Sequence, residues 1–146
     1  METNETMRAL VQQSHHGPGD LILTDVRRPE PGPGEYLVRV GAAGVNFADV
    51  MQTHGSYGGG PKPPYAAGFE AAGEIVRVGP EVEHTFPIGT HVIGAGPGAF
   101  AEYVVLPAGR RASGAVGLER CRGPRSGAEL GDRVSSTEAP GRTRAR

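Results

Sequence analysis

The sequence predicts a mainly β protein, an antiparallel barrel or sandwich that carries one short helix. Three observations lead to this prediction: six or seven short strand-like runs, turn residues between them, and a single stretch of helical periodicity. The chain has 146 residues, which allows one ordinary domain. Its 24 Gly and 13 Pro favour turns and short strands.

The first three expected strands lie before the helix. A cluster of turn residues at 15–20 separates the first from the second, and a proline-rich surface loop at 28–35 leads to the third. In the second strand, Leu21, Leu23 and Asp25 alternate with Ile22 and Thr24. The expected strands cover residues 7–11, 21–26 and 36–40.

The expected helix begins directly after Asn46. Asparagine is a good N-cap because its side-chain oxygen can accept a hydrogen bond from a backbone N–H of the first turn, here near Asp49. A carboxylate in that turn is favoured by the helix dipole. Phe47, Val50 and Met51 stand at i, i+3 and i+4 and form one apolar face. By itself this pattern indicates a capped helical turn, followed by a glycine-rich loop at 55–60.

The second half of the predicted domain begins with prolines at 61–64, which force an extended path. Gly68-x-Glu70-x-x-Gly73 then precedes a strand at 74–78. Two readings of this motif stay open: a strand-entry turn with a solvated Glu70, or a tight backbone path that holds the carboxylate near a cleft. A turn and a strand follow within 87–94, and the last strand covers 99–107.

The run Gly94 to Ala99 matches the dinucleotide fingerprint G-x-G-x-x-A, and we reject that match. The fingerprint must open a helix whose N-terminus holds a pyrophosphate. Residues 100–106 are β-rich and end at Pro107, which leaves no room for such a helix. The glycines are therefore expected to form a loop or a hairpin turn.

The composition excludes several kinds of site. A single cysteine, Cys121, cannot form an internal disulfide or a cysteine-based zinc site. The five histidines have no partners at metal-ligand spacing, so no metal is expected. The N-terminus lacks the apolar stretch of a secretory signal, and no apolar run reaches transmembrane length. We expect a soluble, cytoplasmic protein without a membrane partner.

Residues 109–146 differ sharply from the rest. Residues 1–107 hold 6 basic and 12 acidic residues, whereas 108–146 hold 9 Arg, no Lys and 4 acidic residues. The tail has no aromatic residue and few large aliphatic ones, so we expect disorder there and in residues 1–6. Its Arg, Gly, Ala and Pro content is typical of a GC-rich gene read out of frame. A nucleic-acid-binding arm is the alternative, and scattered acids and missing aromatics argue against it.

Taken in order, these motifs resemble the N-terminal catalytic domain of the medium-chain dehydrogenase/reductases. The motifs are Gly44-Val45-Asn46-Phe47-x-Asp49, Gly55-x-Tyr57, Gly68-x-Glu70-x-x-Gly73, Gly89-x-x-Val92 and Ala99-Phe100-Ala101-Glu102-Tyr103. The resemblance covers residues 7–108 and is strongest to the zinc-independent NADPH:quinone oxidoreductase branch. It implies a GroES-like, partly open β-barrel. Zinc-dependent members carry cysteine and histidine where this chain has Asn46 and Phe69, so the resemblance implies no zinc.

The resemblance also implies a set of site residues. Asn46, Asp49 and Tyr57 would form the catalytic group. Asn46 would hydrogen-bond the cofactor ribose or a substrate oxygen, Asp49 would fix Asn46 and the loop, and Tyr57 would gate or stack on the acceptor. Phe47 would join Asn46 and Tyr57 in contacting NADPH. The substrate pocket would include Met51, Tyr65 and Glu70, with a quinone or enone as the acceptor.

Two departures from the family qualify this assignment. Met51 and Thr53 stand where quinone reductases often carry Tyr and Arg, which weakens the assignment of a quinone. No segment after Pro107 resembles the family's nucleotide-binding Rossmann domain. We therefore expect a catalytic-domain fragment that is inactive alone, binds NADPH weakly and self-associates or dimerises through uncovered strand edges. The alternative function is a non-enzymatic GroES-like binding module.

Overall fold

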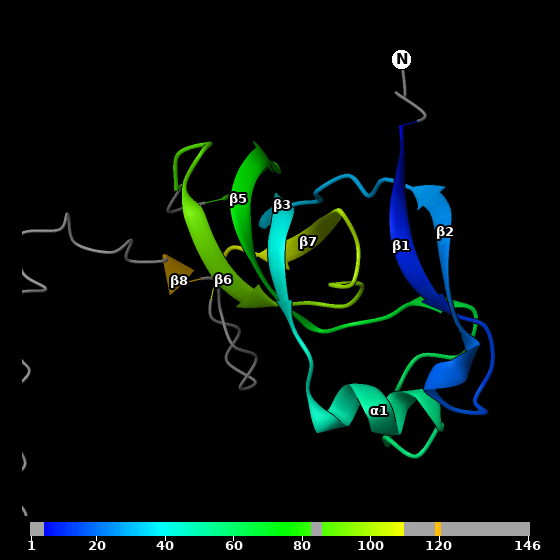
Figure 1. The fold of residues 1–146 in the computed structure, drawn as a ribbon. Coiled ribbons are helices and arrows are strands. Elements are labelled where there is room, and N and C mark those ends of the chain that lie inside the picture. Colours follow the sequence, from blue (N-terminus) through cyan, green and yellow to red (C-terminus); the bar gives the residue numbers. More distant parts are fainter. Residues whose placement is uncertain (1–4, 83–85, 110–118, 121–146) are drawn as a thin grey trace, which may run out of the picture.

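The computed structural model describes residues 5–82, 86–109 and 119–120, which form two antiparallel sheets that do not close into a barrel (Figure 1). The first sheet has the strand order β2-β1-β4 and the second has the order β7-β3-β5-β6-β8. A single short helix, α1, lies at one end of both sheets. The predicted mainly β, GroES-like class is confirmed.

The smaller sheet is built on β1 (Thr6–Gln12), which pairs along its whole length with β2 (Leu21–Arg27). A short 3-10 helix, η1 (Pro18–Asp20), closes the turn between them. On its other side β1 pairs with β4 (Tyr65–Ala66), a two-residue strand. The prolines before Tyr65 had predicted an extended path here, and the structure adds the pairing with β1.

The larger sheet is built on β3 (Glu35–Gly44) and β5 (Glu70–Val78). On the other side of β3 lies β7 (Tyr103–Pro107), and on the other side of β5 lies β6 (His91–Ala95). Glu119 and Arg120 form β8 beside β6. Of the predicted disordered tail, residues 110–118 and 121–146 lie outside the described residues.

Alternating burial explains how this sheet forms a core. Successive strand residues point to opposite faces, and in β5 the buried positions alternate with partly exposed ones. Ile75 is fully buried, as are Tyr36 and Val38 on β3. The Tyr36 hydroxyl accepts a hydrogen bond of 2.8 Å from the Phe86 backbone N–H, which satisfies this buried polar group. The core cluster consists of Tyr36, Val38, Ala71, Ile75, Val92, Ala99, Val104 and Leu106.

The segment before β7 joins the two sheets. Ala101 forms an isolated antiparallel bridge with Ala9 of β1, and the Leu10 N–H donates to the Phe100 carbonyl at 2.8 Å. Gly68 lies against Phe100 with a φ of 87°, and a Cβ there would lie 2.4 Å from the ring. The first glycine of the Gly68–Gly73 motif is therefore required both by backbone conformation and by space.

The predicted strands are all present, with different ends. β3 runs four residues past the predicted end at Val40, and β5 starts four residues before the predicted start at Glu74. These two extensions pair with each other, from Ala42 opposite Ala72 to Gly44 opposite Glu70. Small residues here gave no strand signal, because strand propensity largely reflects side-chain packing. The last strand begins at Tyr103, later than predicted, because Ala101 forms only a bridge.

The helix follows the expected boundaries. α1 covers Phe47–Thr53 and is capped by Asn46. No helix in the part of the chain that the structure describes has the length and apolar character needed to cross a lipid bilayer.

Gly73 should be intolerant of any side chain. A Cβ at this position would lie 2.0 Å from the Arg39 carbonyl oxygen in the neighbouring strand, whereas at Gly41 the nearest atom would be 3.8 Å away. We expect Gly73→Ala to lower the free energy of unfolding by about 3 kcal/mol and Gly41→Ala to change it by less than about 1 kcal/mol. Urea unfolding followed by circular dichroism measures both, and equal midpoints for the two variants would contradict the close approach.

Candidate functional site

The N-terminus of α1 is organised by a capping box between Asn46 and Asp49. Asn46 is extended, with φ −112° and ψ 157°, and its backbone N–H donates to Asp49 Oδ2 at 2.7 Å. Its side-chain oxygen faces the Asp49 N–H without reaching the geometry of a full hydrogen bond. Asp49 is 7% exposed, so its carboxylate serves the backbone rather than the surface. The hydrogen bond joins Asp49 to the backbone of Asn46, and the role of Asp49 in a functional site stays a prediction.

Glu70 completes the polar cluster from the neighbouring sheet. The Asn46 Nδ2 group donates to Glu70 Oε2 at 3.1 Å. Glu70 is the first residue of β5 and lies opposite Gly44, the last residue of β3. Asn46 follows Gly44 by two residues, so the pairing of the strands places the amide beside the carboxylate. The sequence had assigned Glu70 to the substrate pocket, but it had not indicated this contact.

Phe47, the first residue of α1, and Tyr57, four residues past its end, are both exposed. The Phe47 side chain is 78% exposed and the Tyr57 side chain 45% exposed. Met51 is half-buried, and its carbonyl accepts hydrogen bonds from the backbone and hydroxyl of Ser56. No hydrogen bond within residues 5–82 and 86–109 joins the side chains of these three residues to the Asn46–Asp49–Glu70 cluster. They are predicted site residues that share the helix or its loop.

Tyr65 lies close enough to this cluster for the charge of Asp49 to act on its hydroxyl. Its hydroxyl oxygen is buried and has no hydrogen-bond partner among the described residues. Burial, and secondarily the negative charge of Asp49, raises the pKa of the Tyr65 hydroxyl. Four of the predicted site residues are thus linked, three through hydrogen bonds and Tyr65 through the charge of Asp49.

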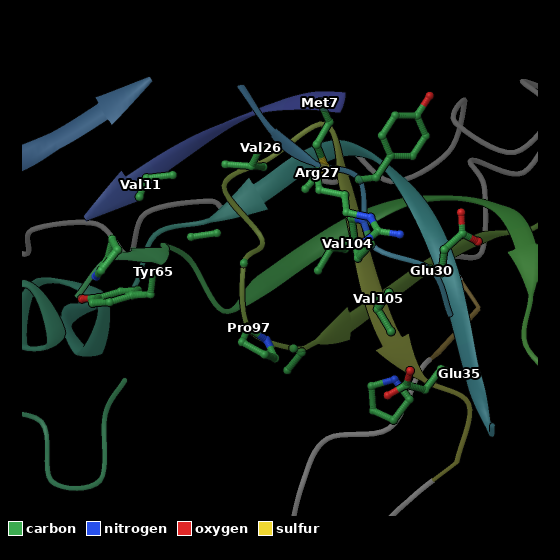
Figure 2. Close-up of a pocket in the computed structure, with 18 residues that line it drawn as sticks. Met7, Val11, Val26, Arg27, Glu30, Glu35, Tyr65, Pro97, Val104 and Val105 are labelled. Carbon is green, nitrogen blue, oxygen red and sulfur yellow. The ribbon is translucent and has the colours of Figure 1, made fainter. Parts of the chain in front are cut away.

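A cavity of about 860 Å³ lies between the two sheets (Figure 2). Its walls are mostly apolar, with Met7, Val11 and Val26 from the smaller sheet and Val104 and Val105 from β7. Tyr65 stands at one end and is the only residue of the predicted site that lines it. The polar cluster at α1 is therefore separate from this cavity and lies nearer to solvent.

The part of the chain that the structure describes contains no group of three or more His, Cys, Asp or Glu side chains that could hold a metal ion. Asn46 and Phe69, the positions at which zinc-dependent proteins of this kind carry ligands by the resemblance above, offer an amide and a ring that is 50% exposed. An amide and a phenyl ring are not zinc ligands in protein sites.

No pattern in the sequence indicates the role of Gln12. This side chain is fully buried, and its Nε2 donates to the carbonyls of Ser14 and Gly17, both at 2.8 Å. The Gly17 N–H in turn donates to the Thr53 carbonyl at the end of α1, at 3.1 Å. Gln12 thereby fixes the turn against which α1 ends. A polar residue at the end of a strand has no pattern that would have predicted this.

Comparison with known proteins gives a consistent set of matches. The profile of the alcohol dehydrogenase GroES-like domain matches residues 32–117. Bovine prostaglandin reductase-3 is 44% identical over 87 residues, which are 60% of this chain and 23% of that protein. A probable quinone oxidoreductase of Leishmania amazonensis is 41% identical over 90 residues, which are 60% of this chain and 26% of that protein.

Solved structures agree with these matches. A mycobacterial protein solved in complex with NADPH has 35% sequence identity and a TM-score of 0.65, over 70% of this chain and 32% of that one. The chain spans about a quarter of the length of the curated relatives that it matches. The profile match also continues beyond residue 108, where the sequence had placed the end of the domain.

The raised pKa of Tyr65 predicts a pH dependence of stability. The unfolded tyrosine ionises near pH 10, and the folded one at a higher pH. The folded chain therefore keeps a proton that the unfolded chain has lost, so stability is intact below about pH 10 and falls as the pH rises through the folded pKa. We expect Tyr65→Phe to remove part of this loss as the pH rises above about 10.

Urea unfolding across this pH range measures the effect, with Tyr57→Phe as the control because Tyr57 is exposed. Parallel curves for the unmodified chain and Tyr65→Phe would show that the buried hydroxyl does not titrate as the structure implies.

Proposed function

We propose, because this chain belongs to the family of alcohol dehydrogenase GroES-like domains, that it forms the catalytic domain of an oxidoreductase that reduces a quinone or an enone with NADPH. The family membership rests on the profile match over residues 32–117. Among the matched proteins are a probable quinone oxidoreductase and a prostaglandin reductase, and a further relative was solved in complex with NADPH. The acceptor, the cofactor and the activity of this chain are our proposal.

The proposal rests on the polar cluster at the start of α1, next to which the Phe47 ring is exposed, and on a second exposed ring, Tyr57, in the loop that follows the helix. Asn46 is exposed and held on two sides, by Asp49 through its backbone and by Glu70 through its amide. Phe47 and Tyr57 are exposed close by along the chain. A fixed hydrogen-bonding group next to one exposed ring, with a second exposed ring in the following loop, suits a ligand that has a flat ring with polar substituents, such as nicotinamide or a quinone.

The bound NADPH would supply the hydride, and the protein would position it. Asn46 would hold an oxygen of the cofactor or the acceptor. Phe47 and Tyr57 would cover apolar ring surface and exclude water from it. Asp49 is too buried to meet a ligand, and its role in the proposal is to fix the backbone of Asn46.

We place the chain in the zinc-independent branch of the wider family. The chemistry of two side chains supports this placement. Asn46 and Phe69 cannot bind zinc as a thiolate and an imidazole would. The acceptor class stays open between quinones and enones. Thr53, at the position where quinone reductases often carry arginine, is 4% exposed, and its hydroxyl donates to the Val50 carbonyl at 2.7 Å. It cannot contact a quinone from there.

Asn46→Ala should impair catalysis in a chimera in which this domain replaces the matching part of the mycobacterial NADPH-binding relative. We expect kcat/KM to fall by about 10- to 100-fold, the effect of removing one hydrogen bond to the reacting assembly. Thr24→Ala, on the exposed face of β2, is the matched control. A chimera that reduces no quinone or enone, or equal rates for Asn46→Ala and the parent chimera, would count against the proposed function.

The 146-residue chain by itself should bind NADPH weakly. Residues 94–99 run from the end of β6 into a loop and then a bridge at Ala101, with no helix to receive a pyrophosphate. We therefore expect titration with NADPH, followed by nicotinamide fluorescence, to give no saturation below about 100 μM. Micromolar binding with turnover of a quinone would show that this chain provides a complete site.

A further inference from the structure

The contact between Glu70 and Asn46 gives Glu70 a role other than touching substrate. Glu74, four residues along the same strand, forms an ion pair with Arg39. Glu70 forms no ion pair with any basic residue in the described ranges, and its carboxylate instead accepts from a neutral amide at 3.1 Å. Both carboxylates lie on the partly exposed face of β5. Of these two carboxylates, only that of Glu70, which lies opposite Gly44, contacts Asn46.

The chemistry of the two groups fixes the orientation of the amide. An ionised carboxylate can only accept hydrogen bonds, so the end of the Asn46 amide that meets Glu70 must be the NH₂ group. The amide oxygen then faces the N–H of Asp49, as the capping box requires. One of the two amide N–H groups is taken by Glu70, and the second remains for a ligand on the exposed side of Asn46.

We propose that Glu70 is a positioning residue for Asn46. It holds the Asn46 amide so that the free N–H of Asn46 donates to an oxygen atom of the ligand, an inference that rests on the proposed function. If the Asn46 amide had the opposite orientation, it would offer its carbonyl oxygen to the ligand and would bind a hydrogen-bond donor of the ligand. With Glu70 in place, Asn46 serves hydroxyl, ether or carbonyl oxygens. The contact therefore favours a ligand group that accepts a hydrogen bond from Asn46 over one that donates to it.

Gly44 leaves the space that this arrangement needs. A Cβ on Gly44 would lie 2.8 Å from Glu70 Oε2, the oxygen that accepts from Asn46, and 3.1 Å from Glu70 Cδ. A methyl group there would push the carboxylate away from the amide. Gly41, in the same strand, has only the Ala72 carbonyl near its Cβ position, at 3.8 Å. The glycine that ends β3 thus controls the position of a side chain on the neighbouring strand.

The side-chain amide protons of Asn46 provide a direct readout in the 146-residue chain. Their NMR signals are assigned by their loss in Asn46→Ala. In Glu70→Ala we expect them to move toward free-amide positions and to exchange with water about three- to tenfold faster, as the loss of one hydrogen bond implies. Gly44→Ala should give the same direction of change. Glu70→Gln retains an acceptor oxygen and should restore much of the original shift.

Glu74→Ala and Gly41→Ala are the matched controls, and both should leave the Asn46 signals in place. Unchanged signals in Glu70→Ala, or equal changes in Glu70→Ala and Glu74→Ala, would overturn the proposal. This measurement needs neither cofactor nor turnover, so its outcome is independent of whether the proposed function is right.

A double-mutant cycle in the chimera tests the functional consequence. Glu70→Ala should lower kcat/KM when Asn46 is present and should have little further effect in the Asn46→Ala background. Additive losses would mean that Glu70 acts on the ligand directly, which overturns its assignment as a positioning residue. If Asn46→Ala alone has no effect, the proposed function fails, while the NMR result still decides whether Glu70 holds the amide.

Discussion

The pairing of β3 with β5 is the constraint on which the rest of the structure depends. The two strands form the centre of the larger sheet, and each has a second neighbour, β7 and β6 respectively. Their register shifts twice, between Leu37 and Val38 and between Val40 and Ala42. Beyond the second shift the strands continue through small residues to Gly44 opposite Glu70. A slip of one residue would send Glu70 to the other face, because side chains alternate along a strand.

This register determines what the two carboxylates near α1 can do. Asp49 turns inward and binds the backbone N–H that begins the helix, while Glu70 stays partly exposed and binds the side chain of the same residue. Asn46 is therefore held by two residues, Asp49 three positions later and Glu70 24 positions later in the chain. The far end of the helix is held separately, by the turn that Gln12 supports. The result is a short helix whose N-terminal end is fixed by the sheet.

Much of this could be predicted from the sequence, for identifiable reasons. Periodicity and turn residues gave every strand of the larger sheet from β3 to β7, and the Asn46–Asp49 spacing gave the helix and its cap. The resemblance identified the family, and the site residues that it implies stay a prediction. The contact of Asn46 with Glu70 could not be predicted, because it depends on a register between residues 24 apart and on a strand segment of Gly and Ala that carries no strand signal. The burial of Gln12 and the separate interior cavity depend on the packing of two sheets, which local patterns do not specify.

The contact between Asn46 and Glu70 depends most directly on the register at the end of β3. Backbone nuclear Overhauser effects in a ¹⁵N-labelled sample measure it. We predict cross-strand contacts that pair Gly44 with Glu70 and Ala43 with Ala71, in continuation of Val40 with Gly73. A pattern that pairs Glu70 with Ala43 or Val45 would turn its side chain away from Asn46 and contradict the arrangement on which the proposed site rests.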